Sequence, residues 1–346
     1  MKAALLTDIQ SIEVRDVPEP EIAGRNDVKL AVHTVGVCGS DMHYYRTGRI
    51  GDQVVEFPFT VGHELSATVL DTGADVTSIC AGDRVAVDPL ICCGKCDQCL
   101  AGREHTCRDQ AFMGVPGQLD GALSERVVMP DYCCHKIPDE MTMDQAALVE
   151  PFSIGMYAQR LAGDVQGKTA AVLGAGPIGL SVLLSLIAAG ARKVYMTDIR
   201  DNRTELARRL GANWTASPRV QDIVRAIRKD TPEGADIAYE CAGEQETADQ
   251  CLELVKPGGT VLIVGIPELD RLSFDMNYMR RGEIRIQNVR RQNKCVQPAI
   301  ELIASAQADA AAMITHHYTL DQTFEAFEVV SDYRDNVVKA MIHVAD

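Results

Sequence analysis

The stretch TAAVLGAGPIGLSVLLSLIAAGARKVYMTDI, at residues 169–199, decides the fold of this chain. Its pattern predicts an apolar strand, a glycine turn, an apolar helix and a second strand. The turn carries Gly174-x-Gly176-x-x-Gly179, a spacing that becomes specific only between a strand and a helix. Glycines there permit a tight turn and a close approach of the backbone to a pyrophosphate, which the helix N-terminus then faces. The stretch therefore predicts a dinucleotide-binding domain.

Asp198 lies nineteen positions after Gly179, at the expected end of the second strand. A carboxylate at this position accepts hydrogen bonds from the adenosine ribose hydroxyls. It also repels a 2′-phosphate, so the sequence favours NAD over NADP, although Arg200 and Arg203 close behind weaken this preference. The alternative interpretation is that Asp198 is only a turn residue at the end of a strand.

The alternation of strands and helices continues beyond this stretch. Residues 219–230 have the pattern of an amphipathic helix, and residues 247–255 predict another helix before Pro257. Further parallel strands are predicted at residues 235–243, 259–267 and 283–289. We therefore expect an α/β domain with an open, doubly wound parallel sheet.

A second informative stretch, GVCGSDMHYYRTGRIGDQVVEFPFTVGHE, spans residues 36–64. It contains Cys38, His63 and Glu64, which can supply a thiolate, an imidazole and a carboxylate to zinc. A catalytic zinc typically takes three protein ligands and leaves the fourth position for water or substrate. The stretch is therefore a candidate catalytic zinc site. The alternative is a buried cysteine and an ordinary surface histidine.

Four further cysteines, Cys93, Cys96, Cys99 and Cys107, follow within one segment. Their tight spacing predicts a closed tetrahedral thiolate site for a structural zinc, because no hydrophobic period explains it. The alternative is a set of unconnected surface thiols. The other cysteines have no ligand spacing, and we interpret them as structural.

The segments on either side of the cofactor domain have a different character. Residues 1–35 alternate apolar and polar residues in short runs, and residues 65–73 and 81–89 predict two more strands joined by a turn. Many short strands separated by glycine and proline predict a partly open barrel. Residues 141–162 look helical, with Pro151 at the start of a helix. After residue 290 we expect helices at 297–308 and 321–332, and a final strand at 338–344.

These patterns divide the chain of 346 residues into two domains. We expect a catalytic domain from residues 1–151 and 290–346, with a Rossmann domain, residues 152–289, inserted between its two parts. The formal charge of −15 disfavours nucleic acid or an anionic membrane surface as a partner. No signal peptide is visible, and the longest apolar run, residues 178–191, is too short to span a bilayer, so we expect a cytoplasmic protein.

Together these residues resemble the zinc-containing medium-chain dehydrogenase/reductase family over essentially the whole chain. The segments HYYRTGRIGD (43–52), GHE (62–64), VEPFSIG (149–155) and NVRRQN (288–293) are most similar to its polyol (sorbitol or xylitol) dehydrogenase branch. The resemblance implies a GroES-like catalytic domain around the Rossmann domain. It implies an enzyme that transfers a hydride from xylitol or sorbitol, oxidised at C2 to the ketose, to NAD. The alternatives are a dehydrogenase of L-threonine or another secondary alcohol, and a non-catalytic nucleotide-sensing protein.

The resemblance also implies roles for individual residues. Cys38, His63 and Glu64 would ligate the catalytic zinc, and Glu150 would either join them or hold the zinc-bound water. Which of the two glutamates touches the metal stays open. Ser40 would pass a proton from the alkoxide towards solvent; its alternative role is a turn hydrogen bond.

For the substrate, the resemblance implies contacts from Tyr44, Glu150 and Arg290 to polyol hydroxyls. Tyr44 could instead be a packing residue and Arg290 a surface charge, and Arg291 stands where the family has a tyrosine. A homo-oligomer is expected, with a tetramer favoured. The expected cofactor-binding residues are Gly174, Gly176, Pro177, Ile178, Gly179, Asp198, Arg203, Gly265, Ile266, Val289 and Arg290.

Overall fold

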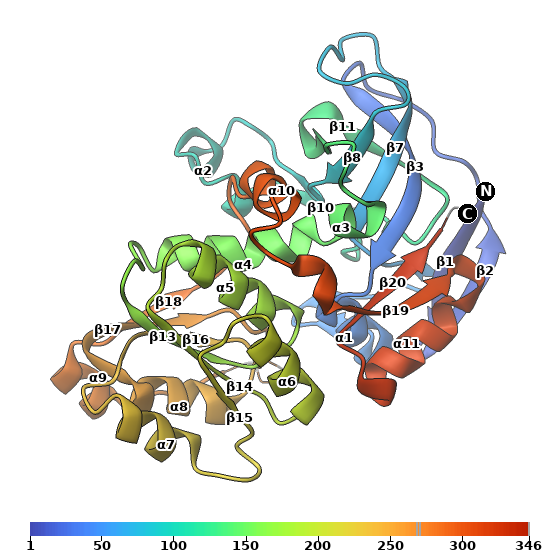
Figure 1. Ribbon diagram of the computed structural model, residues 1–346. Coiled ribbons are helices and arrows are strands. Elements are labelled where there is room, and N and C mark those ends of the chain that lie inside the picture. Colours follow the sequence, from blue (N-terminus) through green and yellow to red (C-terminus); the bar gives the residue numbers. More distant parts are fainter. Residues whose placement is uncertain (268, 270, 345–346) are drawn as a thin grey trace. The chain divides into compact units, whose positions relative to one another are not determined.

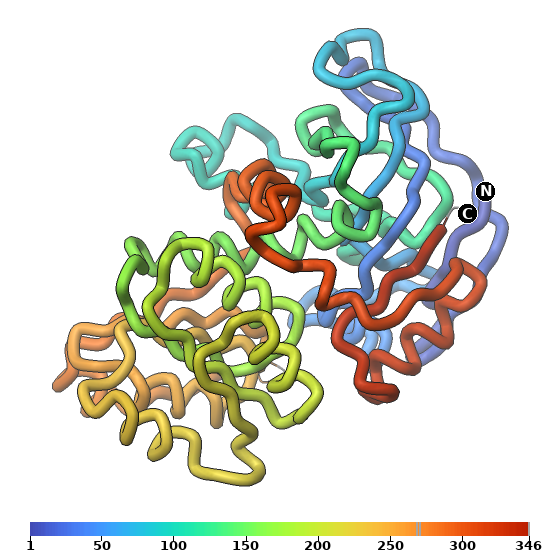
Figure 2. Tube along the Cα trace, in the orientation of Figure 1, coloured from blue at the N-terminus to red at the C-terminus, as the bar shows by residue number. Residues whose placement is uncertain are grey.

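A computed structural model describes residues 1–267, 269 and 271–344 of the chain (Figures 1 and 2). It contains two compact units. The first comprises Met1–Glu150, Val296–Ala304 and the chain from Ile314 onward, and the second comprises Pro151–Cys295 and Ser305–Met313. Each unit is described separately below.

The first unit is built on a seven-stranded sheet in which β11 also pairs with β3. Its main path runs in the order β12-β8-β7-β3-β20-β19, and only the β19–β20 pair is parallel. Along β3, residues on one face are buried and those on the other partly exposed, which explains the alternating sequence. The strands are β3 (Asp27–Gly36), β7 (Glu64–Thr72), β8 (Arg84–Val87), β11 (Arg126–Pro130), β12 (Cys134–Lys136), β19 (Ile314–Thr319) and β20 (Lys339–His343).

Smaller elements surround this sheet. Helix α11 packs against α1, β2 and β20, so the end of the chain joins the core built by its beginning. The short sheets are β2 (Ser11–Asp16) with β1 (Lys2–Asp8) and β6 (Phe59–Thr60), β4 (Arg49–Ile50) with β5 (Gln53–Val54), and β9 (Leu90–Ile91) with β10 (Ala111–Phe112). The helices are α1 (Gly39–Thr47), α2 (Asp97–Leu100), α3 (Met143–Ala147), α10 (Val296–Ala304) and α11 (Thr323–Ser331).

The second unit is an open sheet of six parallel strands in the order β15-β14-β13-β16-β17-β18. Every residue of β13 is buried, as expected for a central strand covered on both faces. Figure 1 shows α5 and α8 on opposite faces of this sheet, so the expected doubly wound α/β fold is confirmed. The strands are β13 (Thr169–Leu173), β14 (Lys193–Thr197), β15 (Trp214–Ala216), β16 (Ala235–Glu240), β17 (Val255–Ile263) and β18 (Arg285–Asn288).

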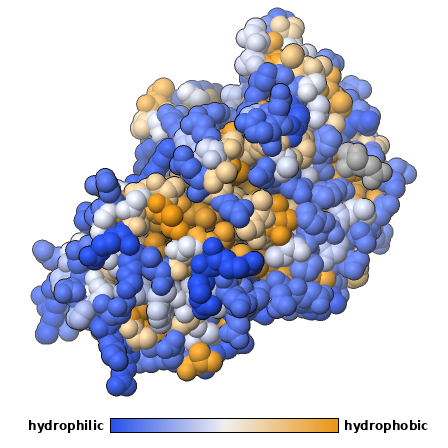
Figure 3. Space-filling model, in the orientation of Figure 1, coloured by the Kyte–Doolittle hydropathy of each residue, from blue (hydrophilic) through white to orange (hydrophobic). Residues whose placement is uncertain are grey.

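Helices α5 to α9 connect successive strands of this sheet, and α4 precedes its first strand. Helix α4 starts at the boundary between the units and carries Pro151 in its first turn, where a missing N–H does no harm. The helices are α4 (Val149–Leu161), α5 (Pro177–Ala188), α6 (Asp201–Arg209), α7 (Ile223–Asp230), α8 (Gln245–Leu254) and α9 (Met276–Gly282). No helix in the described ranges is long and apolar enough to cross a membrane. Hydrophilic side chains cover most of the face shown in Figure 3.

The end of the second unit differs from the expected return near residue 290. The second unit continues to Cys295, and within it the Arg160 guanidinium donates a hydrogen bond to the Lys294 carbonyl at 3.0 Å. A further piece, Ser305–Met313, also belongs to it, because the short helix η3 (Ala310–Met313) packs against α5. Of the chain after Cys295, only α10 and the residues that follow Met313 belong to the first unit.

Candidate metal centre and cofactor site

Cys38, His63 and Glu64 lie together in the first unit. Cys38 directly precedes α1, while His63 and Glu64 lie at the start of β7. Because Gly36 pairs with Glu64 across the antiparallel β3–β7 ladder, the residues that follow β3 lie beside the start of β7. One ligand atom from each of the three side chains lies within 4.8 Å of the other two. A thiolate, an imidazole and a carboxylate are donors that suit zinc.

The imidazole of His63 is buried and has a carboxylate beside it. Its Nδ1 lies 3.5 Å from Asp41 Oδ1, and Asp41 is held in turn by hydrogen bonds from the backbone N–H groups of Gly62 and Cys38. Burial lowers the pKa of His63, but the negative charges of Asp41 and Cys38 more than offset this effect and raise it well above its usual value. A carboxylate on Nδ1 leaves Nε2 available, which is the common arrangement of a metal-binding histidine.

Glu150, near the start of α4, is buried close to these residues. Burial raises the pKa of its carboxyl group to about 7, while the charge of His63 lowers this pKa by a smaller amount and the charge of Glu64 raises it. The structure therefore places Glu150 within electrostatic range of both residues. Among the described residues, however, the ligand group within 4.8 Å contains only Cys38, His63 and Glu64.

Lys339 belongs to this site and was missed by sequence reasoning. Its Nζ forms an ion pair with Glu64 Oε2 and donates a hydrogen bond to the Val37 carbonyl at 2.9 Å. The side chains of Lys339 and Glu64 are each only 1% exposed. The available signal was a lysine within the apolar segment VVKAMIHV, because lysine is almost never fully buried without a partner.

Two other expected residues, Ser40 and Tyr44, lie on α1. The Ser40 hydroxyl donates a hydrogen bond to Cys38 Sγ at 3.3 Å, so it lies next to the candidate metal ligand. Tyr44 is buried, and its hydroxyl donates to Gln53 Oε1 at 3.0 Å. The ring of Tyr44 therefore contributes to packing, while its hydroxyl keeps a polar partner.

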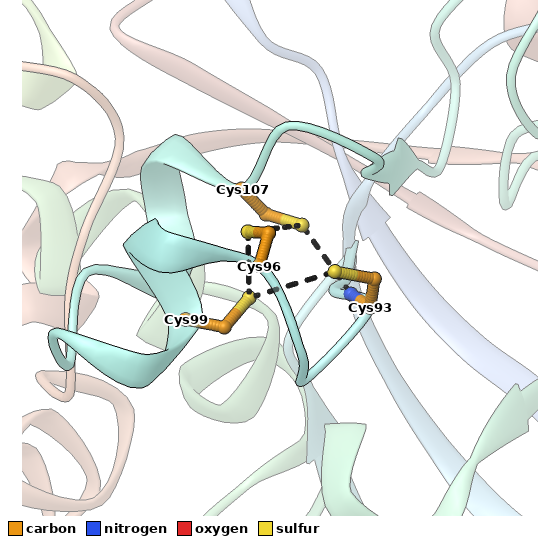
Figure 4. A group of neighbouring side chains, drawn as sticks. All are labelled: Cys93, Cys96, Cys99 and Cys107. Atoms are coloured by element: carbon orange, nitrogen blue, oxygen red, sulfur yellow. Dashed lines mark hydrogen bonds between the residues drawn. The ribbon is translucent and has the colours of Figure 1, made fainter.

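The four clustered cysteines form a second candidate metal centre (Figure 4). Their sulfur atoms point towards one another, with Sγ–Sγ distances of 4.0 Å for Cys93–Cys99, 3.6 Å for Cys96–Cys99 and 3.9 Å for Cys96–Cys107. Zn–S bonds of about 2.3 Å in a tetrahedron give separations of roughly 3.8 Å, whereas a disulfide needs about 2.05 Å. The distances therefore fit a zinc held by four thiolates.

Backbone hydrogen bonds in this loop lower the pKa of two thiols, Cys93 and Cys96, whereas burial raises the pKa of Cys99 and Cys107. The N–H groups of Arg108 and Cys99 lower the pKa of Cys96 to about 6. Cys107 Sγ accepts hydrogen bonds from the N–H groups of Cys93 and Asp109, at 3.3 and 3.4 Å. Such N–H···S bonds orient the sulfur atoms and stabilise negative charge on them.

The glycine turn lies between β13 and α5 in the second unit. Gly174 has φ +104°, and a Cβ there would lie 2.8 Å from the backbone of Cys241, so the position requires glycine. A Cβ on Gly179 would overlap the Gly174 carbonyl. At Gly176 a Cβ would meet only Arg203 Nη1, at 3.6 Å, and Pro177 begins α5. The turn thus leaves open space before a helix N-terminus, as a pyrophosphate site requires.

Asp198 follows β14 and is held beside this turn. Its Oδ2 accepts a hydrogen bond from the Ala175 N–H at 2.8 Å, its Oδ1 accepts one from the Arg200 N–H at 2.9 Å, and Arg203 Nη1 lies 3.8 Å away. A carboxylate has about four acceptor positions, so two remain for other donors. Asp198 therefore combines a structural role with free acceptor capacity beside the glycine turn.

The remaining expected cofactor residues lie after neighbouring strands of the same sheet. Gly265 and Ile266 follow β17, and Val289 and Arg290 follow β18; Ile266 and Arg290 are exposed. The strand order reverses between β13 and β16, and ligands of open α/β sheets bind at the carboxyl ends of strands around such a reversal. Glu240, at the end of β16, lies at the same edge of the sheet and was not identified from the sequence. Its Oε1 accepts hydrogen bonds from the N–H groups of Ala242 and Gly243.

Comparison with known protein families and with individual proteins gives matches in both units of the chain. Residues 24–139 match the alcohol dehydrogenase GroES-like domain, and residues 177–305 match the zinc-binding dehydrogenase domain. The chain is 35% identical to the sorbitol dehydrogenase of Bacillus subtilis (strain 168), over 99% of this chain and 97% of that protein. It is 34% identical to a Rhizobium meliloti (strain 1021) protein provisionally named D-xylulose reductase, over 99% of both.

A solved structure gives the same result for the fold. A provisionally named zinc-binding dehydrogenase from Sinorhizobium meliloti 1021, bound to NADP, superposes with a TM-score of 0.91 at 32% sequence identity. The alignment covers 99% of each chain. The similarity therefore extends over the residues of both units.

Proposed function

Because this chain belongs to the zinc-containing medium-chain dehydrogenase/reductase family, in its polyol dehydrogenase branch, we propose that it oxidises a sugar alcohol at C2 to the ketose and transfers the hydride to NAD. The observation that carries the proposal is the convergence of Cys38, His63 and Glu64 within 4.8 Å. Xylitol and sorbitol are the substrates that we propose. The names of the two relatives support this choice.

We assign the three converging residues to a catalytic zinc. A zinc ion held there supplies Lewis-acid chemistry that lowers the pKa of the substrate hydroxyl. Asp41 orients the His63 ring, and Lys339 balances the charge of Glu64. We assign to Ser40, whose hydroxyl lies 3.3 Å from Cys38 Sγ, the role of taking up the substrate hydroxyl proton while it releases its own proton towards solvent. Glu150 lies outside the ligand group, which supports a role in holding the fourth, non-protein ligand.

The four clustered cysteines hold a second, structural zinc in this proposal. Closed thiolate sites leave no open position for a substrate and contribute directly to folding. Their sulfur separations of 3.6 to 4.0 Å support the assignment. All twelve cysteines are free in the structure, which supports a reducing compartment, the cytoplasm, as the working location.

For the cofactor, we propose NAD rather than NADP. Asp198 keeps two acceptor positions beside the glycine turn, where they suit the two hydroxyls of an unphosphorylated ribose. A 2′-phosphate at this point would be repelled by the carboxylate. Arg203, at 3.8 Å, and the NADP bound to the similar Sinorhizobium meliloti dehydrogenase are the observations against it.

The polyol itself needs fixed donors and acceptors rather than a deep apolar pocket. We propose Tyr44, Glu150 and Arg290 for this role. Tyr44 and Glu150 belong to the first unit, and Arg290 lies exposed at the end of β18 in the second. A site built to bind hydroxyls rejects analogues that lack them, because its own polar groups are then left unpaired.

A substrate panel tests the proposal. Initial rates of NAD reduction are measured with xylitol, sorbitol, L-threonine, ethanol and 2-propanol, and the product is identified by NMR. We expect the polyols to give the highest kcat/KM and a ketose product. A preference for L-threonine or a simple alcohol would refute the polyol assignment. Tight NAD binding without turnover of any substrate would instead support the non-catalytic alternative.

A further inference from the structure

Three side chains outside the sites described above meet on the first unit. They are Asp144 on α3, His317 on β19 and His343 on β20. Asp144 Oδ1 lies 2.9 Å from His343 Nε2, and Asp144 Oδ2 lies 3.5 Å from His317 Nδ1. The two imidazole rings have their centroids 5.2 Å apart. One carboxylate thus faces a nitrogen atom from each of two histidines.

Strand pairing explains why these distant residues meet. In the parallel β19–β20 pair, His317 lies opposite Met341, and His343 is two residues further along β20. Side chains two residues apart on a strand share a face, so both histidines project from the same side of the sheet. Helix α3 packs on the neighbouring strands β3 and β7 and brings Asp144 to this side. The cluster therefore belongs to the fixed framework of the unit.

We propose that Asp144, His317 and His343 form a third metal site, which binds a divalent transition ion such as Zn²⁺. Two imidazoles and one carboxylate are a donor set that zinc takes in proteins, with water in the fourth position. Zinc bonds of about 2.0–2.1 Å in a tetrahedron place neighbouring ligand atoms roughly 3.3 Å apart. The ligand atoms of Asp144, His317 and His343 are separated by distances from 2.9 Å to at most 4.8 Å, a range that includes this value.

A metal ion binds both imidazole rings in their neutral form together with the carboxylate, so all three side chains would hold it at once. A hydrogen-bonded cluster of the same side chains without metal is the alternative that the experiment below tests. The side chains are 24% exposed for Asp144, 51% for His317 and 40% for His343, so an ion and a water ligand can reach them.

Thr34 provides an independent observation. It lies opposite His343 in the β3–β20 ladder, and its hydroxyl donates a hydrogen bond to Asp144 Oδ1 at 3.0 Å. Ligating carboxylates are usually oriented by such an outer hydrogen bond. The ion would join α3 to the last two strands of the chain. It would therefore stabilise the return of the C-terminal segment onto the N-terminal part of the unit.

The test measures zinc content and thermal unfolding of the complete protein after dialysis against micromolar Zn²⁺. We expect wild type to hold one zinc per chain more than His317→Gln and His343→Gln, and to unfold at a higher temperature when that zinc is present. His316→Gln is the matched control, because His316 is adjacent on β19 and stacks on Tyr318 instead of facing Asp144. Thr34→Val should weaken binding of the extra zinc about 10- to 100-fold.

Two results would overturn the proposal. One is equal zinc content in wild type and in all three histidine variants. The other is loss of the extra zinc in His316→Gln to the same degree as in His343→Gln, which would indicate non-specific surface binding. If the histidine variants fail to fold, Asp144→Asn keeps the side-chain shape and must lose the extra zinc. The test does not depend on the proposed polyol activity, because it compares metal content and not turnover.

Discussion

Lys339, on the last strand of the chain, forms an ion pair with Glu64, at the first residue of β7, and both side chains are 1% exposed. Gly36 lies between them in the sheet, opposite Glu64 in one ladder and opposite Met341 in the other. A Cβ at Gly36 would overlap the Glu64 carboxylate and would lie 2.9 Å from Lys339 Cε. The missing side chain of Gly36 therefore makes room for the ion pair.

Substitution of Lys339 by methionine should strongly destabilise the first unit. It would leave the buried Glu64 carboxylate without its cation, and breaking a buried pair typically costs about 3–5 kcal/mol. Denaturant unfolding of the metal-free protein measures the loss, because a zinc ion held by Glu64 would itself balance the charge of this carboxylate. Lys136→Met is the matched control, because Lys136 pairs with Asp83 at the surface, where a pair contributes at most about 1 kcal/mol. Similar losses in both variants would contradict the importance of the buried pair.

The two zinc assignments predict different outcomes for two cysteine substitutions. Wild type should hold at least two zincs per chain by elemental analysis. Cys38→Ser should lose one zinc and abolish turnover while the protein stays folded, because an open catalytic site contributes little to the core. Cys96→Ser should lose the other zinc and mainly lower the unfolding temperature, because closed sites contribute folding energy. Unchanged zinc content in Cys96→Ser would refute the structural site.

The cofactor proposal predicts the effect of Asp198→Ala. Removal of the carboxylate should weaken NAD binding and raise the kcat/KM for NADP relative to that for NAD, because the repulsion of a 2′-phosphate disappears. Asp201→Ala is the control, since Asp201 is exposed in the same segment and should leave the ratio unchanged. A wild-type preference for NADP would contradict the proposal.

The substrate proposal predicts that Arg290→Ala discriminates between alcohols. It should cost about 2–4 kcal/mol in kcat/KM for xylitol, in the range for removing a partner of buried hydrogen-bonding groups. The loss should be much smaller for 2-propanol, which has no second hydroxyl. Arg285→Ala, an exposed arginine on β18, should affect neither substrate. Equal losses on both alcohols would show that Arg290 serves the cofactor or the fold.

The last prediction concerns the oligomeric state: we expect a homo-oligomer, and in particular a tetramer. The strand β18 forms one edge of its sheet, and exposed apolar side chains precede it, including Ile266 at 51%, Leu269 at 57% and Met276 at 67%. Exposed edges and apolar patches are typical of association surfaces. Light scattering should give four times the chain mass, and Met276→Asp should lower it. Val220→Asp, at a 78% exposed position elsewhere, should not.

The local spacing of residues in the sequence was sufficient to predict the glycine turn and the cysteine cluster. The glycine turn and α5 could be predicted because strand, turn and helix follow one another within twenty residues. The four clustered cysteines could be predicted because all of them lie in one loop of fifteen residues. In both cases the chain is too short between the important residues to place them far apart. The fold class follows from the same local patterns, summed over both units.

The tertiary structure decided the contacts between distant segments. Lys339 reaches Glu64, and His317 and His343 reach Asp144, only because β20 pairs with β3 and β19 with β20. No spacing rule connects residues that are separated by more than 170 positions. Strand register, which alternates side chains between two faces, determines which of them meet. The same applies to the boundary near Cys295, where Arg160 donates a hydrogen bond to the Lys294 carbonyl across 134 positions of sequence.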